Sequence, residues 1–383
     1  MNNPQLVSPK GQIPKGGRVR GSARAFVRKL HLWLGLSAGL LLCITGLTGS
    51  LLVFYPEIDT LIHAENRSAS NIRPQSWAAV DQSLRREFPG RPGAWRLEVT
   101  EDGGAIPARY FPVDAQGDRA LKPFLVWVDP RTYSVIRDAR WGSEPMTWIY
   151  DLHRRLLLDL PGATAMGIFA LTFLPLLLGS GLWAWWPRAG SVWKSLKFPK
   201  GATGAKRLYG FHKLVGLASL SVLPILAITG AMLNLPDVSR GALSAVSPLV
   251  TNPAPASTPV GKALLLDDLL ARAEHAFPGA EPAWIETPGT AEGAVQITFA
   301  QAHEPSRRFP RTIVWLDQYS GAILATRDPR ADGAGDVVLN WLHPIHAGEL
   351  LGLPGRLALF ATGLLPSVLL LTGWLRYRRR KRL

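Results

Sequence analysis

The stretch His31-Leu-Trp-Leu-Gly35-Leu36 returns later in the chain as His212-Lys-Leu-Val-Gly216-Leu217. In both copies a glycine follows the histidine four residues later, and a long apolar run begins there. An imidazole ring that faces a membrane interior is costly unless it has a function. The repeat therefore predicts a membrane α-helical bundle with an internal duplication, and it marks its histidines as functional candidates.

A second histidine also repeats, because Trp148-x4-His153 matches Trp341-x4-His346. The chain has 8 histidines, and four of them occupy these equivalent positions. Imidazole is a usual axial ligand of haem iron. Four paired histidines on membrane helices therefore indicate a membrane cytochrome.

Four apolar stretches are long enough to cross a bilayer. Each has about 23 to 28 residues, and a helix rises about 1.5 Å per residue, so each covers the hydrocarbon core. We therefore expect four transmembrane helices. The stretches are roughly residues 32–55, 163–186, 208–235 and 353–375.

The chain has a formal net charge of +15, and the distribution of its basic residues agrees with four spans. Lysine and arginine gather, without any acid, in residues 1–30, 187–207 and 376–383. In a chain with four spans these segments share one side, which is the positive-inside pattern of cytoplasmic loops. The sequence thus predicts a bacterial inner-membrane protein with an uncleaved first span and cytoplasmic N and C termini. It does not indicate a nucleic-acid partner.

Two polar segments, 56–146 and 236–335, lie on the opposite side. Phe88-Pro89-Gly90 in the first matches Phe277-Pro278-Gly279 in the second. A helical start that ends at Pro-Gly, followed by alternating apolar and polar residues, is typical of a small α+β fold. We expect two small α+β periplasmic domains.

The predicted order of segments combines these elements. It runs from a basic cytoplasmic tail (1–30) through a first transmembrane helix (31–55), a first periplasmic domain (56–146), a second transmembrane helix with a periplasmic extension (147–186), a basic cytoplasmic loop (187–207), a third transmembrane helix (208–235), a second periplasmic domain (236–335), a fourth transmembrane helix with a periplasmic extension (336–376) and a basic cytoplasmic tail (377–383).

Topology sorts the four histidines into two levels. The first and third spans run outward, so His31 and His212 lie at their cytoplasmic ends. The second and fourth spans run inward, so His153 and His346 lie at their periplasmic ends. Two bis-histidine haems stacked in a four-helix bundle fit this arrangement. The sequence has no Cys-x-x-Cys-His motif, so both haems would be non-covalent haem b.

Four further residues are candidate haem contacts. Gly35 and Gly216 lie one turn from their histidines, where they would leave room for a flat macrocycle or for close helix packing. Arg154 and Arg356 lie near the outer helix ends, where they would pair with haem propionates or anchor the chain at the interface.

His343 competes with His346 as a ligand of the outer haem. The repeat register favours His346, because Trp341-x4-His346 aligns with Trp148-x4-His153. His343 has no counterpart in the first half.

Several short motifs resemble the PepSY-associated transmembrane family in order and spacing. They are His31/Gly35, Leu152-His153-Arg154, Ser180-Gly181-Leu182-Trp183, His212/Gly216, His346-Ala347-Gly348 and Thr372-Gly373-Trp374. Within that family the chain is most similar to inner-membrane di-haem ferric-siderophore reductases of the ferrioxamine type. The resemblance implies two haem b groups, PepSY-like outer domains, and reduction of a periplasmic ferric siderophore of the hydroxamate type with release of Fe(II) for iron uptake. The electron donor stays open between a quinol and a flavoprotein.

Two other functions fit parts of the sequence. A non-redox membrane protein would use its PepSY-like periplasmic domains to bind or inhibit a partner, and it would be colourless. An iron or haem permease is the other alternative, although four spans without a conspicuous polar pathway disfavour it.

One length conflicts with a straight second span. A continuous helix from His153 to Trp186 would run about 50 Å, which exceeds a bilayer core. Helix tilt, a break at Leu160-Pro161-Gly162 or a deeper His31 would shorten it. The sequence therefore leaves the distance between the two haems open.

Overall fold

The computed structural model describes residues 16–69, 72–100, 103–113, 119–120, 122–187 and 191–381. The chain divides into two compact units. The first unit consists of Met1–Cys43, Thr172–Pro224 and Leu365–Leu383, and the second of Ile44–Leu171 and Ile225–Leu364.

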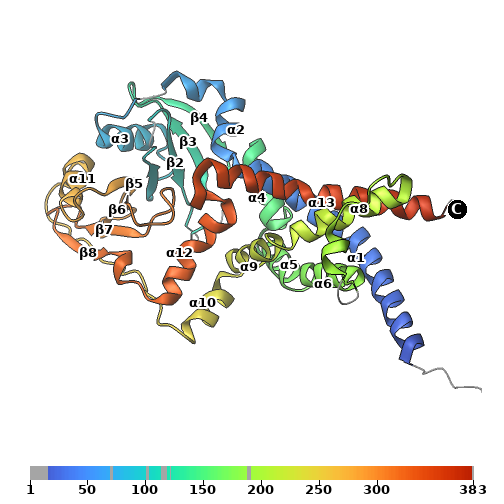
Figure 1. Ribbon diagram of the computed structural model, residues 1–383. Coiled ribbons are helices and arrows are strands. Elements are labelled where there is room, and N and C mark those ends of the chain that lie inside the picture. Colours follow the sequence, from blue (N-terminus) through green and yellow to red (C-terminus); the bar gives the residue numbers. More distant parts are fainter. Residues whose placement is uncertain are drawn as a thin grey trace, which may run out of the picture. The chain divides into compact units, whose positions relative to one another are not determined.

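Long apolar helices supply the candidate membrane spans (Figure 1). Three of these spans are Ala23–Val53 within α1 (Gly16–Val53), Asp159–Trp185 over α5 (Asp159–Leu171) and α6 (Phe173–Trp185), and Glu349–Arg379 with α13 (Gly352–Lys381). A fourth is formed by α8 (Gly204–Ser219) and α9 (Leu223–Asn234) if this bent pair is one span. The prediction of a membrane helical protein is thus confirmed, with three to four helices able to span.

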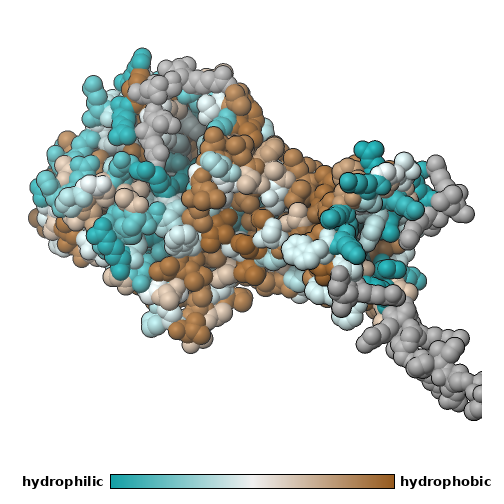
Figure 2. All heavy atoms as spheres, in the orientation of Figure 1, coloured by the Kyte–Doolittle hydropathy of each residue, from teal (hydrophilic) through white to brown (hydrophobic). Residues whose placement is uncertain are grey.

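The outward side chains of these helices suit a lipid environment. Leu40, Leu176 and Leu371 expose 53%, 56% and 55% of their surface. Figure 2 shows apolar side chains over the surface of the long helices. Exposed leucines on this scale would be unfavourable in water, because apolar surface costs free energy there, but they are the expected lining of a helix that faces acyl chains.

The second predicted span does not continue into the helix that carries His153. That helix, α4 (Pro145–Arg155), ends where Leu156 and Leu157 adopt left-handed backbone angles, with φ of 52° and 62°. The next helix, α5, begins at Asp159. A Cβ at Gly162 would overlap the Arg155 carbonyl oxygen, so glycine is needed where α5 passes the end of α4. The break thus starts just before Leu160-Pro161-Gly162.

A single antiparallel sheet of eight strands lies in the second unit, in the order β4-β3-β2-β1-β5-β6-β7-β8. Helices α3 (Trp77–Glu87) and α11 (Leu266–Glu274) contribute to its core, in which Val80, Leu97, Leu269 and Ile285 are almost fully buried. The strands are β1 (Trp95–Glu98), β2 (Ile106–Tyr110), β3 (Phe124–Val128), β4 (Val135–Arg140), β5 (Glu281–Glu286), β6 (Val295–Ala300), β7 (Thr312–Leu316) and β8 (Ile323–Arg327).

The segments 56–146 and 236–335, in which two small α+β domains are expected, contribute four strands each to this sheet. Strands β1 and β5 pair antiparallel, with Arg96 opposite Glu286 and Leu97 opposite Ile285. An unpaired strand edge exposes backbone donors and acceptors, and joining two edges removes both exposures. The segments 56–146 and 236–335 therefore share one sheet and one core.

Shorter helices complete the described part of the chain. They are α2 (Tyr55–Ile62), η1 (Ala64–Ala69), α7 (Val192–Leu196), α10 (Pro236–Ser244), η2 (Pro329–Ala331), α12 (Ala334–Ala347) and η3 (Glu349–Leu351).

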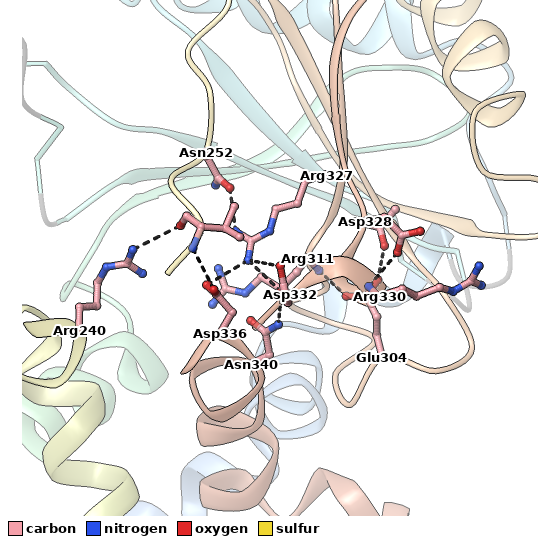
Figure 3. A network of polar contacts seen from close by, with 12 residues as sticks. Arg240, Asn252, Glu304, Arg311, Arg327, Asp328, Arg330, Asp332, Asp336 and Asn340 are labelled. Carbon is pink, nitrogen blue, oxygen red and sulfur yellow. Dashed lines mark hydrogen bonds and ion pairs between the residues drawn. The ribbon is translucent and has the colours of Figure 1, made fainter. Parts of the chain in front are cut away.

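A buried network of charged side chains fixes α12, the helix of His346, against the sheet (Figure 3). Arg327 at the end of β8 contacts Asp332 at 3.0 Å and Asp336 at 3.5 Å. Asn340 donates to Asp332 at 2.9 Å, and the backbone N–H of Val250 donates to Asp336 at 2.9 Å. Because these groups are buried and hydrogen-bonded, they restrain the position of α12.

We expect Asp336→Ala to destabilise the second unit, because it leaves the buried guanidinium of Arg327 with one carboxylate fewer. Breaking a buried ion pair costs about 3–5 kcal/mol, so the thermal midpoint of the purified protein should fall by several degrees. Arg307→Ala is the matched control, since its ion pair with Glu281 is exposed and such pairs contribute less than about 1 kcal/mol. Equal midpoints for the two variants would contradict a structural role for the network.

Candidate site: two histidine pairs

The first unit brings together His31 and His212. They project from α1 and α8, and their ring centroids lie 6.2 Å apart with the ring planes at 76°. Both residues are the histidines that open the repeated sequence blocks. The structure therefore places the two predicted inner ligands side by side.

The second unit brings together His153 and His346 in the same way. They project from α4 and α12, with ring centroids 6.3 Å apart and ring planes at 58°. The two pairs have almost the same spacing although they are built from different helices.

Each histidine anchors one ring nitrogen on the backbone of a neighbouring helix. The Nδ1 atoms of His31, His153 and His212 lie 3.2, 2.9 and 3.1 Å from the carbonyl oxygens of Leu177, Thr45 and Leu369. The His346 ring bonds the Leu226 carbonyl. A carbonyl oxygen only accepts, so the bonded Nδ1 carries the proton and Nε2 keeps a free lone pair.

A hydroxyl group stands beside each of these bonds. The contacts to Nδ1 are 3.1 Å from Ser180 to His31, 3.1 Å from Thr48 to His153, 3.0 Å from Thr372 to His212 and 2.9 Å from Thr229 to His346. Each hydroxyl also donates to a carbonyl of its own helix. Its single proton is thus engaged, and its oxygen can accept from Nδ1–H.

A glycine follows each of these hydroxyl residues and seats the imidazole ring. A Cβ added at Gly49, Gly181 or Gly230 would lie 2.9, 2.8 and 2.8 Å from Cε1 of His153, His31 and His346. At Gly373 the distance to Cε1 of His212 would be 3.4 Å. Ring and helix backbone therefore touch directly, which holds the ring in one orientation.

The spacing of each pair suits a metal ion held between two imidazoles. Two coordination bonds of about 2 Å, plus about 1.15 Å from each nitrogen to its ring centre, put ring centroids roughly 6.3 Å apart. The observed separations are 6.2 and 6.3 Å. An Nδ1–H bonded to a carbonyl is also the usual outer contact of a metal-binding histidine.

The protein supplies two donors at each pair. Among the described residues, no group of three or more His, Cys, Asp or Glu side chains is placed to hold a metal. Two imidazoles without a third protein donor would suit an iron whose remaining ligands come from a macrocycle. The residues present therefore fit a haem, which the histidines of each pair would hold.

The glycines singled out from the sequence lie away from direct contact with the rings. A Cβ at Gly35 would meet Leu177 at 3.9 Å, and one at Gly216 would meet Leu369 at 3.7 Å. These are ordinary packing distances.

The first unit also has a groove of about 330 Å³ between α1 and α13. It is lined by Leu36, Leu40, Ser367, Leu370, Leu371 and Trp374.

The two candidate arginines bond protein groups at helix ends. Arg154 donates to the Asn234 side chain at 3.1 Å and to the Leu233 carbonyl at 3.2 Å. Arg356 donates to the Val53 carbonyl at 2.8 Å and pairs with Glu57 at 2.7 Å. Both residues therefore join helices, and their contact with haem propionates stays a prediction.

His343 lies outside both pairs. Its Nδ1 is 3.5 Å from Glu349 Oε1, and its ring packs at 5.0 Å from that of Phe309. Partial burial lowers the pKa of His343 below its usual range, and nearby Glu349 opposes that shift. It is His346, not His343, that faces His153.

The Ser/Thr-Gly pairs are the site residues that sequence reasoning did not assign. One pair contacts each of the four histidines: Thr48-Gly49, Ser180-Gly181, Thr229-Gly230 and Thr372-Gly373. The equal spacing from His31 to Thr48-Gly49 and from His212 to Thr229-Gly230 was the available signal. The sequence did not reveal which helices pack together to bring each Ser/Thr-Gly pair to its histidine.

The family profile described as the PepSY-associated TM region matches residues 28–380. The match includes both histidine pairs and the whole sheet. A search of curated proteins finds no match.

We expect Gly181→Ala to disturb the first pair, because its methyl group would overlap the ring of His31. Overpacking of this kind costs about 1–3 kcal/mol, so the thermal midpoint should fall. Gly179→Ala, two residues away on the same helix, meets no atom within 4 Å and should leave the midpoint unchanged or slightly raised. If both variants behaved alike, the close seat of the ring would be refuted.

Proposed function

The chain belongs to the PepSY-associated TM region family, and we propose that it is an inner-membrane di-haem reductase of periplasmic ferric siderophores. The observation that carries the haem proposal is the matched geometry of the two histidine pairs. Both have the spacing of a bis-imidazole metal site, and their Nδ1 atoms face carbonyl oxygens. The substrate rests on the resemblance of the motifs to siderophore reductases.

His31 and His212 would hold one haem b, and His153 and His346 the other. When bound, haem supplies reversible one-electron chemistry, with a potential set by its axial ligands, hydrogen bonds and burial. The chain contributes the fixed ring orientations. It also contributes the carbonyl bonds that make each imidazole a stronger donor.

Helices that carry the paired histidines also hold buried apolar residues. Ala38 lies in α1 with His31, and Met146 lies in α4 with His153, with exposures of 8% and 1%. A dry environment of this kind limits reorganisation of solvent around a charge that changes by one unit. Both units therefore provide a site suited to electron transfer.

The proposed substrate explains why a reductase would release iron. Ferric iron is a hard, highly charged ion that oxygen ligands such as hydroxamates hold tightly. Addition of one electron gives Fe(II), which has a lower charge and a weaker preference for hard oxygen donors. The electrons would come from a quinol or a flavoprotein.

Ligand substitutions test the pairing. We expect His31→Ala or His212→Ala to lose one haem of two, and His153→Ala or His346→Ala to lose the other, because each pair lies within one unit. Haem per chain and the reduced-minus-oxidised spectrum measure this. His275→Ala removes an exposed histidine and should keep both haems, as should His343→Ala. Two full haems in all four ligand variants would refute the assignment.

Substrate addition tests the reductase. Dithionite-reduced protein, freed of excess reductant under anaerobic conditions, should reoxidise when a ferric hydroxamate is added, and an Fe(II) chelator should then trap the released iron. The gallium complex of the same hydroxamate is the control, since Ga(III) has the same charge but is not reduced. Haem that stays reduced with the ferric chelate would end the siderophore proposal while leaving a cytochrome. A protein that remains colourless when supplied with haem would favour the partner-binding alternative.

A further inference from the structure

A concave basic groove of about 480 Å³ lies in the first unit, between α7, α8 and the end of α13. Hydrophilic side chains gather around α8 and the end of α13 (Figure 2). The groove is lined by Lys194, Lys197, Lys206, Lys213 and Arg376, together with Phe198, Pro199, Ala205 and Tyr209.

The groove is held together by specific contacts. Lys213 on α8 donates to the backbone carbonyls of Ser195 and Lys197, which draws the α7 segment onto the helix. The rings of Phe198 and Phe211 pack at 4.9 Å. A Cβ at Gly210 would lie 2.9 Å from Pro199, so glycine permits the close approach. The basic side chains therefore surround a formed hollow.

No Asp or Glu side chain belongs to the same unit as these cations. The segments 1–43, 172–224 and 365–383 contain no Asp or Glu at all. Five cations around one concave surface focus a positive potential and attract an anion. The first unit thus supplies no acidic side chain to offset the positive potential of the groove.

The donors match phosphate oxygens. Lysine binds phosphate as a point charge, and arginine can present two parallel N–H groups to it. The Arg376 guanidinium lies 4.5 Å from the centre of the Tyr209 ring. This cation–π contact orients the N–H groups of the guanidinium. Five positive charges suit an anion with more than one phosphate.

Neighbouring residues place the groove at a lipid headgroup layer. Trp193 on α7 is 82% exposed, directly before Lys194, and exposed tryptophan is typical of a membrane interface. Tyr209 and Phe211 are also exposed, on a helix that continues toward the candidate span. A membrane lipid can reach such a groove laterally. Basic pockets at the cytoplasmic ends of spanning helices are known sites for anionic headgroups.

We propose that this groove binds the headgroup of an anionic phospholipid, and that a lipid with two phosphates, such as cardiolipin, occupies it best. The proposal rests on the membrane location in the proposed function but not on haem. Lipid binding and haem content can therefore fail separately.

Native mass spectrometry of the delipidated full chain in detergent tests the groove, with cardiolipin, phosphatidylglycerol and phosphatidylcholine added in turn. The unaltered protein should retain cardiolipin most strongly and phosphatidylcholine least. The double variant Lys194→Gln with Lys206→Gln should bind cardiolipin about tenfold more weakly or worse. Neither residue contacts a histidine of the pairs, so haem content measured on the same samples should not change.

Matched variants separate the groove from general surface charge. Arg28→Gln with Lys29→Gln removes two positive charges of the same unit outside the groove and should keep tight cardiolipin binding. Lys194→Arg with Lys206→Arg keeps the charge and should also bind, which shows that the groove still folds. Equal losses in both Gln pairs, or no loss in either, would overturn the proposal. It would likewise be overturned if inorganic pyrophosphate displaced cardiolipin at comparable concentration, because the ligand would then be a soluble phosphate.

Discussion

The hydrogen bond from the ring of each of the four paired histidines to a backbone carbonyl of another helix is the contact on which the two sites depend. It fixes the tautomer, so that Nε2 is the nitrogen left for a partner. It also requires two helices to approach closely, and Gly49, Gly181 and Gly230 allow that approach because a Cβ there would overlap the ring. Ring orientation and helix packing are therefore one constraint.

The second unit shows how the sheet supports such a site. His346 lies on α12, and the buried bonds of Arg327, Asp332 and Asp336 hold the start of that helix to the end of β8. The sheet is continuous through β1 and β5, so the segments 56–146 and 236–335 share one sheet. Both histidines of the second pair thus belong to the same unit as the sheet.

Sequence reasoning predicted the parts that repeat locally and missed those that depend on distant pairing. The four histidines and their grouping follow from the repeated blocks, from scarcity and from topology. The pairing of β1 with β5 could not be predicted from the sequence. Leu97 and Ile285 are far apart in the chain, and nothing in the sequence of a strand shows which other strand its edge will pair with. The glycines Gly35 and Gly216 were chosen by proximity along the helix. The rings instead rest on glycines of other helices, which no helical periodicity reveals.

The most direct test of the two sites is low-temperature electron paramagnetic resonance of the oxidised protein, combined with haem quantification per chain. Two haems per chain should give low-spin ferric signals of bis-histidine type. Because the rings are twisted by 76° and 58°, the signals should be strongly anisotropic. High-spin iron, a single haem or signals typical of parallel rings would contradict the geometry. Absence of haem after supply of the cofactor would contradict the central claim altogether.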